Sequence, residues 1–147
     1  MSGIFSAFRI ATSALTGQRL RMDIIANNVA NAETTRTEEG GPYQKQTVVF
    51  QAAEGDSTLP VNLPNRVREP ARGLRVTEII KDDSPGNRVY DPSHPDADEE
   101  GFVSYPNVNI VTEMTDMLSA TRSYEANVTV FNALKNMALR ALDIGRG

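Results

Sequence analysis

The sequence predicts an α+β protein with long helices at its two ends, which pair as a coiled-coil-like bundle, and a small β-rich region between them. Apolar residues near both ends recur in alternating steps of four and three positions, which is the heptad spacing of paired helices. The middle lacks this period and carries short alternating stretches bounded by glycine and proline. At 147 residues the chain fits one domain, which we divide into residues 1–34, 35–106 and 107–147.

The first helix is expected to run from Ile4 to Ala30, a length of about 40 Å at about 1.5 Å per residue. Its stripe consists of Ile4, Phe8, Ala11, Leu15, Met22, Ile25 and Val29, with Gln18 in the one polar slot. The stripe ends among three asparagines, Asn27, Asn28 and Asn31. Asparagine is a poor helix former that tolerates left-handed geometry, and its amide both donates and accepts hydrogen bonds. A helix end needs only one such residue, so three favour polar contacts with a neighbouring subunit as well.

The second helix is expected to span Val108 to Leu142, about 50 Å. Either Asn107 or Asn109 is a suitable N-cap, and Gly145 is a suitable C-terminal stop. The stripe consists of Ile110, Met114, Met117, Thr121, Tyr124, Val128, Phe131, Ala138 and Leu142, with Lys135 as the exception. The matching period at the two ends predicts that these helices pack on each other.

The middle region is expected to form a small β unit. "YQKQTVVFQ" from Tyr43 and "LRVTEIIKD" from Leu74 alternate as strands do, and "NRVY" and "GFVSY" are short strand candidates near the turn "SPGN". Residues 53–73 carry three prolines and little apolar periodicity, so we expect an exposed loop. A basic cluster in and beside this loop suits either an acidic neighbour or a plain soluble loop; it consists of Arg66, Arg68, Arg72 and Arg75.

Composition excludes several classes of function. The net charge of -4 and the pI near 5.0 argue against bulk nucleic-acid binding. The absence of cysteine excludes disulfide frameworks and thiolate chemistry. No apolar run approaches the roughly 20 residues of a membrane span, and the first residues do not resemble a cleavable signal peptide.

No stretch carries a convincing catalytic or metal site. "DADEEG" from Asp96 imitates a calcium loop, but the twelfth position is Asn107 instead of glutamate, and Pro92 and Pro95 preclude an entering helix. The single histidine, His94, lies between prolines, and the chain has no Gly-x-Ser-x-Gly elbow. We therefore expect no enzyme activity, no cofactor and no metal.

Both helices carry more apolar residues than one partner stripe covers, which favours contacts with further helices. An ordinary helical hairpin that packs only on itself remains the alternative. The additional residues are Ile10, Leu20, Val29, Ala30, Val111, Leu118, Val130, Leu134 and Leu139.

Four stretches resemble a known family. "ANNVANAETT" from Ala26 is similar to the signature at the end of the first helix in axial proteins of the bacterial flagellum, and "YEANVTVFNALKNMALRALDI" from Tyr124 resembles their terminal helix. "GPYQKQTVVFQ" from Gly41 and "YDPSHPDADEEGFVSYPNVN" from Tyr90 resemble, within that group, the proximal members of the basal-body rod protein family. The segment from Ala53 to Gly73 resembles nothing in the family.

The resemblance implies a structural subunit of the proximal rod, the torque-transmitting drive shaft that crosses the periplasm. Such a subunit assembles through its terminal helices with copies of itself and with other rod proteins, and it meets the membrane-ring proteins at the base of the rod. It also implies passage through the flagellar type III export apparatus without a cleaved signal peptide. A soluble helical adaptor or export chaperone that binds a partner helix is the alternative function.

The residues expected at subunit interfaces lie on the stripes, beside them and among the asparagines. They are Ile4, Phe8, Ala11, Leu15, Met22, Ile25, Asn27, Asn28, Val29, Asn31, Met114, Met117, Leu118, Tyr124, Val128, Phe131, Leu134, Ala138 and Leu142.

Overall fold

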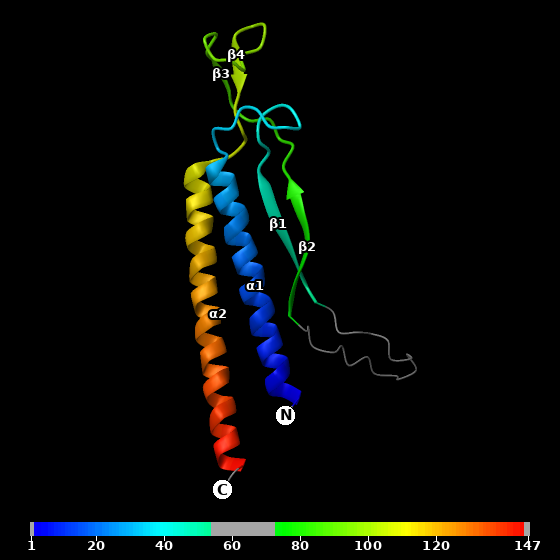
Figure 1. Ribbon diagram of the computed structural model, residues 1–147, viewed down its shortest axis with the longest axis vertical. Coiled ribbons are helices and arrows are strands. Elements are labelled where there is room, and N and C mark those ends of the chain that lie inside the picture. Colours follow the sequence, from blue (N-terminus) through cyan, green and yellow to red (C-terminus); the bar gives the residue numbers. More distant parts are fainter. Residues whose placement is uncertain (1, 54–72, 146–147) are drawn as a thin grey trace, which may run out of the picture.

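A computed structural model describes residues 2–53 and 73–145. Its elements are α1 (Ser2–Ala30), β1 (Gln46–Ala52), β2 (Leu74–Lys81), β3 (Arg88–Tyr90), β4 (Phe102–Ser104) and α2 (Ile110–Gly145). The molecule is elongated, with α1 between α2 on one side and the β1–β2 pair on the other, and with β3 and β4 at the end far from both termini (Figure 1). The α+β class is confirmed, with two long helices at the ends and small antiparallel sheets between them.

α1 packs through two faces. One carries the predicted stripe, whose members are all buried or half-buried, and its Phe8 ring packs edge to face on Phe131 of α2 with the ring centroids 5.2 Å apart. The other face lies against the β1–β2 pair. There a Cβ atom added to Gly17 would lie 2.5 Å from Cδ2 of Leu74 and 3.2 Å from Cε1 of Phe50. The side of α1 at Gly17 is therefore covered within the chain.

The α1-facing line of α2 passes through Glu113 at its start, where the prediction had Ile110 and Met114. Glu113 and Ala120 are the most buried residues of this helix, at 1% and 0% exposure, whereas Met114 of the predicted stripe is 63% exposed and Ile110 is 43% exposed. The spacing rule fails here because it assigns a charged residue to solvent, and Glu113 is buried with partners. The remaining stripe members except Leu142 are half-buried; they are Met117, Thr121, Tyr124, Val128, Phe131 and Ala138.

Asparagine side chains mark both helix ends next to the middle region. The backbone N–H and the side-chain amide of Asn31 donate to the carbonyl oxygen of Asn27, at 3.1 and 2.9 Å, where α1 ends. Asn109 is the N-cap of α2, because its Oδ1 accepts a hydrogen bond of 3.1 Å from the N–H of Thr112. Of the two predicted N-cap candidates, Asn107 has a different role, described below.

The β1–β2 pair is antiparallel and runs from Gln46 opposite Lys81 to Ala52 opposite Leu74, with an irregularity in the register between Val49 and Phe50. One face of the pair is half-buried against α1, and the other is exposed. A lone two-stranded pair is marginal in water, so this one depends on the helix it covers.

β3 and β4 form a second antiparallel pair, which together with its connecting loop makes a knob at the end of the molecule (residues 88–104) (Figure 1). The Phe102 ring meets Tyr90 edge to face at 5.3 Å, and the Arg88 guanidinium lies over its face at 5.0 Å. Val103 is fully buried. In the connecting loop Asp98 accepts hydrogen bonds from two backbone N–H groups and pairs with Arg88.

Three further sequence expectations concern metal sites, the arginine cluster and membrane spans. The described residues contain no group of three or more His, Asp or Glu side chains able to hold a metal ion. Arg75 is exposed on β2, while Arg66, Arg68 and Arg72 lie outside the described residues. Neither described helix combines the length and the apolar character that a membrane crossing requires.

Candidate assembly surfaces and the polar junction

Asn28 lies at the point where α1, β1 and α2 meet, and its side chain is 1% exposed. Its Nδ2 donates to the backbone carbonyl of Gln46 at 2.8 Å and to Oε2 of Glu113 at 2.9 Å. Its Oδ1 accepts from the backbone N–H of Gln46 at 2.9 Å and from the hydroxyl of Tyr43 at 3.0 Å. Two donors and two acceptor sites are all that an asparagine amide offers, so Asn28 is fully engaged within the chain.

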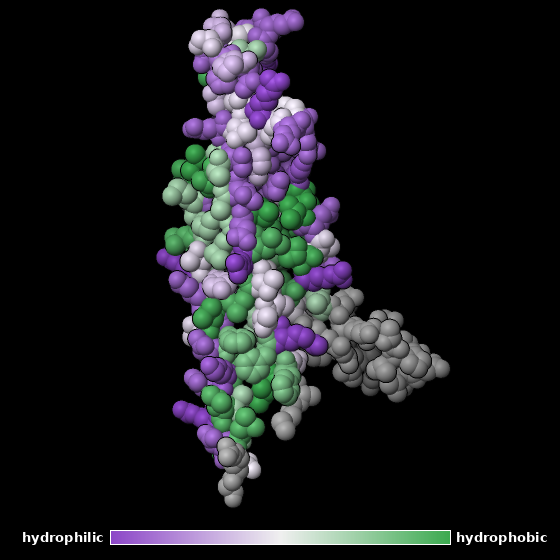
Figure 2. All heavy atoms as spheres, in the orientation of Figure 1, coloured by the Kyte–Doolittle hydropathy of each residue, from purple (hydrophilic) through white to green (hydrophobic). Residues whose placement is uncertain are grey.

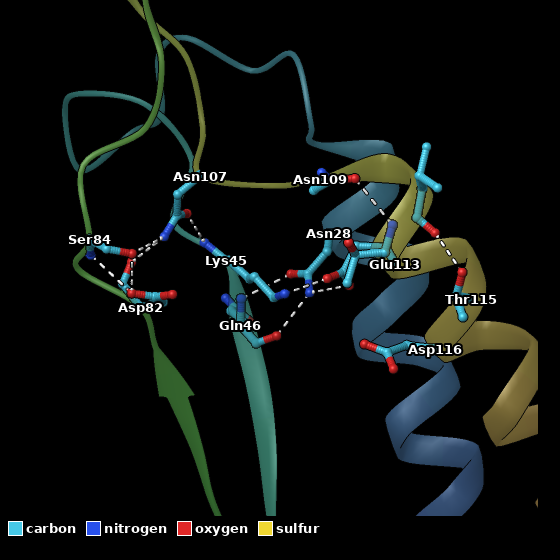
Figure 3. A network of polar contacts seen from close by, with 12 residues as sticks. Asn28, Lys45, Gln46, Asp82, Ser84, Asn107, Asn109, Glu113, Thr115 and Asp116 are labelled. Carbon is cyan, nitrogen blue, oxygen red and sulfur yellow. Dashed lines mark hydrogen bonds and ion pairs between the residues drawn. The ribbon is translucent and has the colours of Figure 1, made fainter.

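Glu113, in the first turn of α2, contacts both Asn28 and Lys45, the residue just before β1. Its Oε1 pairs with Nζ of Lys45 at 2.6 Å, and its Oε2 accepts the bond from Asn28 (Figure 3). The carboxylate is almost fully buried, and the Lys45 side chain is about one quarter exposed, at 24%. A buried carboxylate is tolerated only when it is paired and hydrogen-bonded, and Glu113 meets both conditions.

Asn107, just before α2, holds the neighbouring strand ends. Its Oδ1 accepts from the backbone N–H of Lys45 at 3.0 Å, and its Nδ2 donates to the carbonyl of Asp82 at 3.1 Å and to the Ser84 hydroxyl at 3.0 Å. The backbone N–H of Asp82 in turn donates to the carbonyl of Lys45 at 2.8 Å. We call the set Asn28, Tyr43, Lys45, Gln46, Asn107 and Glu113 the polar junction; Figure 3 labels all of its members except Tyr43.

The electrostatics at the junction act on Tyr43. Burial and the nearby Glu113 carboxylate raise the pKa of the Tyr43 phenol above its ordinary value of 10.0, while Lys81 opposes this shift. The phenol therefore stays protonated at neutral pH and remains a donor to Asn28.

The structure separates the residues that were expected at subunit interfaces into two groups. Residues on the α1 stripe and on most of the α2 stripe are buried or half-buried where the two helices pack within one chain. All four hydrogen bonds of the Asn28 side chain are made within the chain, whereas the sequence suggested that this side chain contacts a neighbouring subunit. Asn27, Met114, Leu118 and Leu142 are exposed.

Sequence reasoning missed Lys45, Tyr43, Gln46 and Glu113 as members of this site. One feature of the sequence could have indicated that Glu113 faces α1: it lies four residues before Met117, one helical turn earlier on the same face. No local feature distinguishes Tyr43, Lys45 and Gln46 from ordinary surface residues.

Exposed apolar residues gather at the two ends of α2. The distal patch lies on its first turns, next to the knob, and consists of Ile110, Val111, Met114 and Leu118. The terminal patch lies on its second half and consists of Val130, Met137, Leu139, Leu142 and Ile144. Figure 2 shows hydrophobic residues over the first turns of α2 and again toward the end of the molecule that carries the termini.

The terminal patch is exposed partly because α2 is longer than its partner. Phe131 packs on Phe8, and α1 begins only six residues before Phe8, at Ser2. The last turns of α2, up to Gly145, therefore extend about 12 Å past the start of α1 at about 1.5 Å per residue. Figure 1 shows this overhang.

The arrangement does not favour catalysis. One concave surface, of about 680 Å³, is lined mostly by polar loop residues that lie between positions 37 and 46, 81 and 88, and 104 and 107. A second cleft of about 340 Å³ lies beside the junction, between Ile24 of α1, Phe50 of β1 and Asp116 of α2. Ser84 lines the first of these surfaces and donates its hydroxyl to the Asp82 carboxylate at 2.5 Å, but among the described residues neither lining includes a histidine. The prominent features are the paired helices, the junction and the two exposed patches.

Comparison with known proteins identifies the family. Residues 8–36 match the family model described as "Flagella basal body rod protein", and residues 99–144 match "Flagellar basal body rod FlgEFG protein C-terminal". The chain is 46% identical to the flagellar basal-body rod protein FlgC of Borreliella burgdorferi, over 99% of both chains. It is 44% identical to FlgC of Bacillus subtilis and 40% identical to FlgC of Escherichia coli, over 97% of this chain and 98% of each relative.

The relatives match α1, α2 and the middle region together, because the alignments span nearly the whole chain. The resemblance stated on the sequence motifs is thereby confirmed. This chain belongs to the FlgC family of flagellar basal-body rod proteins.

Proposed function

We propose that this chain builds the proximal rod by presenting a coiled-coil-like pair of terminal helices whose exposed faces are covered by helices of neighbouring rod subunits. Family membership makes the chain a structural subunit of the flagellar basal-body rod, which assembles with other rod proteins, and not an enzyme. The proposal concerns how it assembles.

The observation that carries the proposal is the exposed apolar surface of α2. Met114, Leu142 and Ile144 are 63%, 59% and 82% exposed in the isolated chain. Clusters of such residues at the two ends of one helix are typical of interaction surfaces. The two patches differ in sequence and place. Contact between two different surfaces generates an open helical assembly when the rotation between subunits does not close into a ring.

In this proposal the three parts of the chain have different positions in the rod. Residues 1–34 and 107–147 form the helical inner part of the assembly, and residues 35–106 form a β-rich part that projects from it. Arg75 is exposed on β2 and can contact an acidic neighbour, while the other arginines of the predicted cluster lie outside the described residues. The terminal patch, together with exposed Asn27, completes the set of candidate subunit contacts.

We further propose that the subunit crosses the type III export apparatus without a cleaved signal peptide, reaches the periplasm and contacts the membrane-ring proteins at the base of the rod. Support comes from the family, because the relatives named above are flagellar basal-body rod proteins. In the structure residues 2–20 are part of α1, which packs on α2.

The test replaces one residue in each patch, Met114→Glu and Leu142→Glu, in cells whose only copy of the protein carries the change. Because both side chains are exposed, the purified monomers should keep their thermal midpoints. Recovery of the protein in detergent-extracted basal bodies and swimming motility should both fall strongly. Asn136→Glu adds the same charge at an exposed polar position of α2 and serves as the matched control.

Normal incorporation and motility in both patch variants would remove the patches from the assembly contacts. Recovery of the wild-type protein in the soluble fraction, bound to another protein and absent from basal bodies, would instead favour the adaptor alternative.

A further inference from the structure

Three parts of the chain that are remote in sequence share one buried carboxylate. Glu113 comes from the first turn of α2, its partner Asn28 comes from the end of α1, and Lys45 immediately precedes β1. Each oxygen of the carboxylate is used by a different partner. Asn28 continues the connection by pairing with both backbone groups of Gln46, the first residue of β1.

The apolar side chains by which the β1–β2 pair packs on α1 are only half-buried. Within the described residues, the buried apolar side chains are Ala11, Ile24, Ile25, Val103 and Ala120. None of these belongs to β1 or β2. Since a two-stranded pair is marginal by itself, its attachment depends heavily on the hydrogen bonds at its end.

We infer that pairing of α2 with α1 and docking of the β1–β2 pair on α1 are one cooperative event, fastened by Glu113. When α2 leaves α1, the Asn28 amide and the Lys45 ammonium lose the carboxylate that satisfies them. When the β1–β2 pair leaves α1, Glu113 loses its charge partner and stays beside a hydrophobic seam. An unpaired buried charge is strongly unfavourable, so each contact requires the other. The coupling is reciprocal by thermodynamic necessity.

The order of the chain gives this coupling a consequence. α1, β1 and β2 all precede residue 110, so they are complete in sequence before α2 begins. Until α2 packs on α1, however, these elements lack the Glu113 carboxylate that holds the β1–β2 pair on α1. The finished β surface, with the knob that Asn107 connects to it, therefore appears only when the two terminal helices have paired. This inference concerns the folding of a single chain and does not depend on how the rod assembles.

Native-state hydrogen exchange on the full-length wild-type monomer tests the coupling directly. Amides of β1 and β2 and those on the α1-facing side of α2 between residues 113 and 131 should respond to added denaturant as one group, with a common opening free energy. If the helices exchange freely in the monomer, the strands should exchange freely as well. Protected strands beside unprotected helices, or two separate denaturant responses, would overturn the inference.

A pair of matched variants then identifies the fastening residue. Glu113→Gln should lower amide protection in both β1–β2 and the first turns of α2 by on the order of tenfold or more. Asp116→Asn makes the same chemical change one turn along the helix, where the carboxylate forms a partly exposed pair with Arg21 at 3.6 Å, and should leave the strands protected. Equal effects of the two variants, or an effect of Glu113→Gln on α2 alone, would remove Glu113 from this role.

The reverse direction uses a milder change in the β region. Lys45→Met keeps the length of the side chain and removes its charge, and it should lower protection in the first turns of α2 as well as in β1. A loss confined to β1 would show that the two contacts are independent, even if Glu113→Gln itself fails to fold.

Discussion

The side-chain amide of Asn28 and the carboxylate of Glu113 are 85 positions apart in the sequence and meet in a buried hydrogen bond of 2.9 Å. Asn28 lies in the last turn of α1, and Glu113 lies in the first turn of α2. The bond therefore fixes the relative height of the two helices at the end where both enter the middle region. It also brings β1 into the same contact, since Gln46 bonds Asn28 through both of its backbone groups.

Replacement of Asn28 by alanine should destabilise the monomer by about 3 kcal/mol, because it leaves buried groups of Gln46, Tyr43 and Glu113 without their partner. The neighbouring Asn27 is exposed, so Asn27→Ala should change the free energy of unfolding by less than about 0.5 kcal/mol. Urea denaturation of the two variants beside the wild type measures both values. Similar midpoints for the two variants would contradict the role assigned to Asn28.

Phe131→Ala should also destabilise the isolated chain, by about 2 kcal/mol. The estimate is below the usual cost for a fully buried phenylalanine because the ring is half-buried against Phe8. Val130 is 51% exposed, and Val130→Ala should be close to neutral. Thermal or urea midpoints of the monomers give the comparison. An unchanged midpoint for Phe131→Ala would mean that the helices pair only inside the rod.

Gly86→Ala should disrupt the neck between the β1–β2 pair and the knob. A Cβ atom on Gly86 would overlap the carbonyl oxygen of Tyr105 and would lie 2.8 Å from the carbonyl carbon of Pro106. Backbone atoms cannot rotate away, so we expect a loss of about 3 kcal/mol. Gly3→Ala, in an open position of α1, should be neutral or stabilising by up to about 0.5 kcal/mol. Equal stability of Gly86→Ala and wild type would refute this packing.

The knob should loosen in acid. The hydrogen bond from the backbone N–H of Phe102 is the main cause that lowers the pKa of Asp98 below its ordinary value of 3.8. Desolvation opposes this shift, and the hydrogen bonds from the Arg88 side chain and the N–H of Glu100 add to it. Because the pKa is lower in the folded state than in the unfolded state, the stabilisation is complete above pH 3.8 and is lost as the pH falls through the folded value.

An NMR titration of the Asp98 carboxyl and of the Phe102 amide measures this transition. Both signals should change together below pH 3.8, and Asp98→Asn should remove the carboxyl transition. A midpoint at or above 3.8 would contradict the hydrogen bonding described for this loop.

The sequence by itself determined the elements of this protein. The steps of four and three positions specified two helices, and the alternation in "TVVF" and "LRVTEII" specified the strands, because these signals depend on neighbours a few residues away. The family was also readable from short motifs, since the segments at Ala26 and Tyr90 are continuous in the chain.

Tertiary structure decided which residue of each helix faces which partner. The spacing rule assigned Met114 to the seam and left Glu113 to solvent, yet Glu113 is buried because Lys45 and Asn28 pair with it. Periodicity also could not show that Leu74 and Phe50 cover one side of α1 at Gly17. Burial of a charge and contact between surfaces depend on groups brought together from distant positions, and periodicity within one segment carries no information about them.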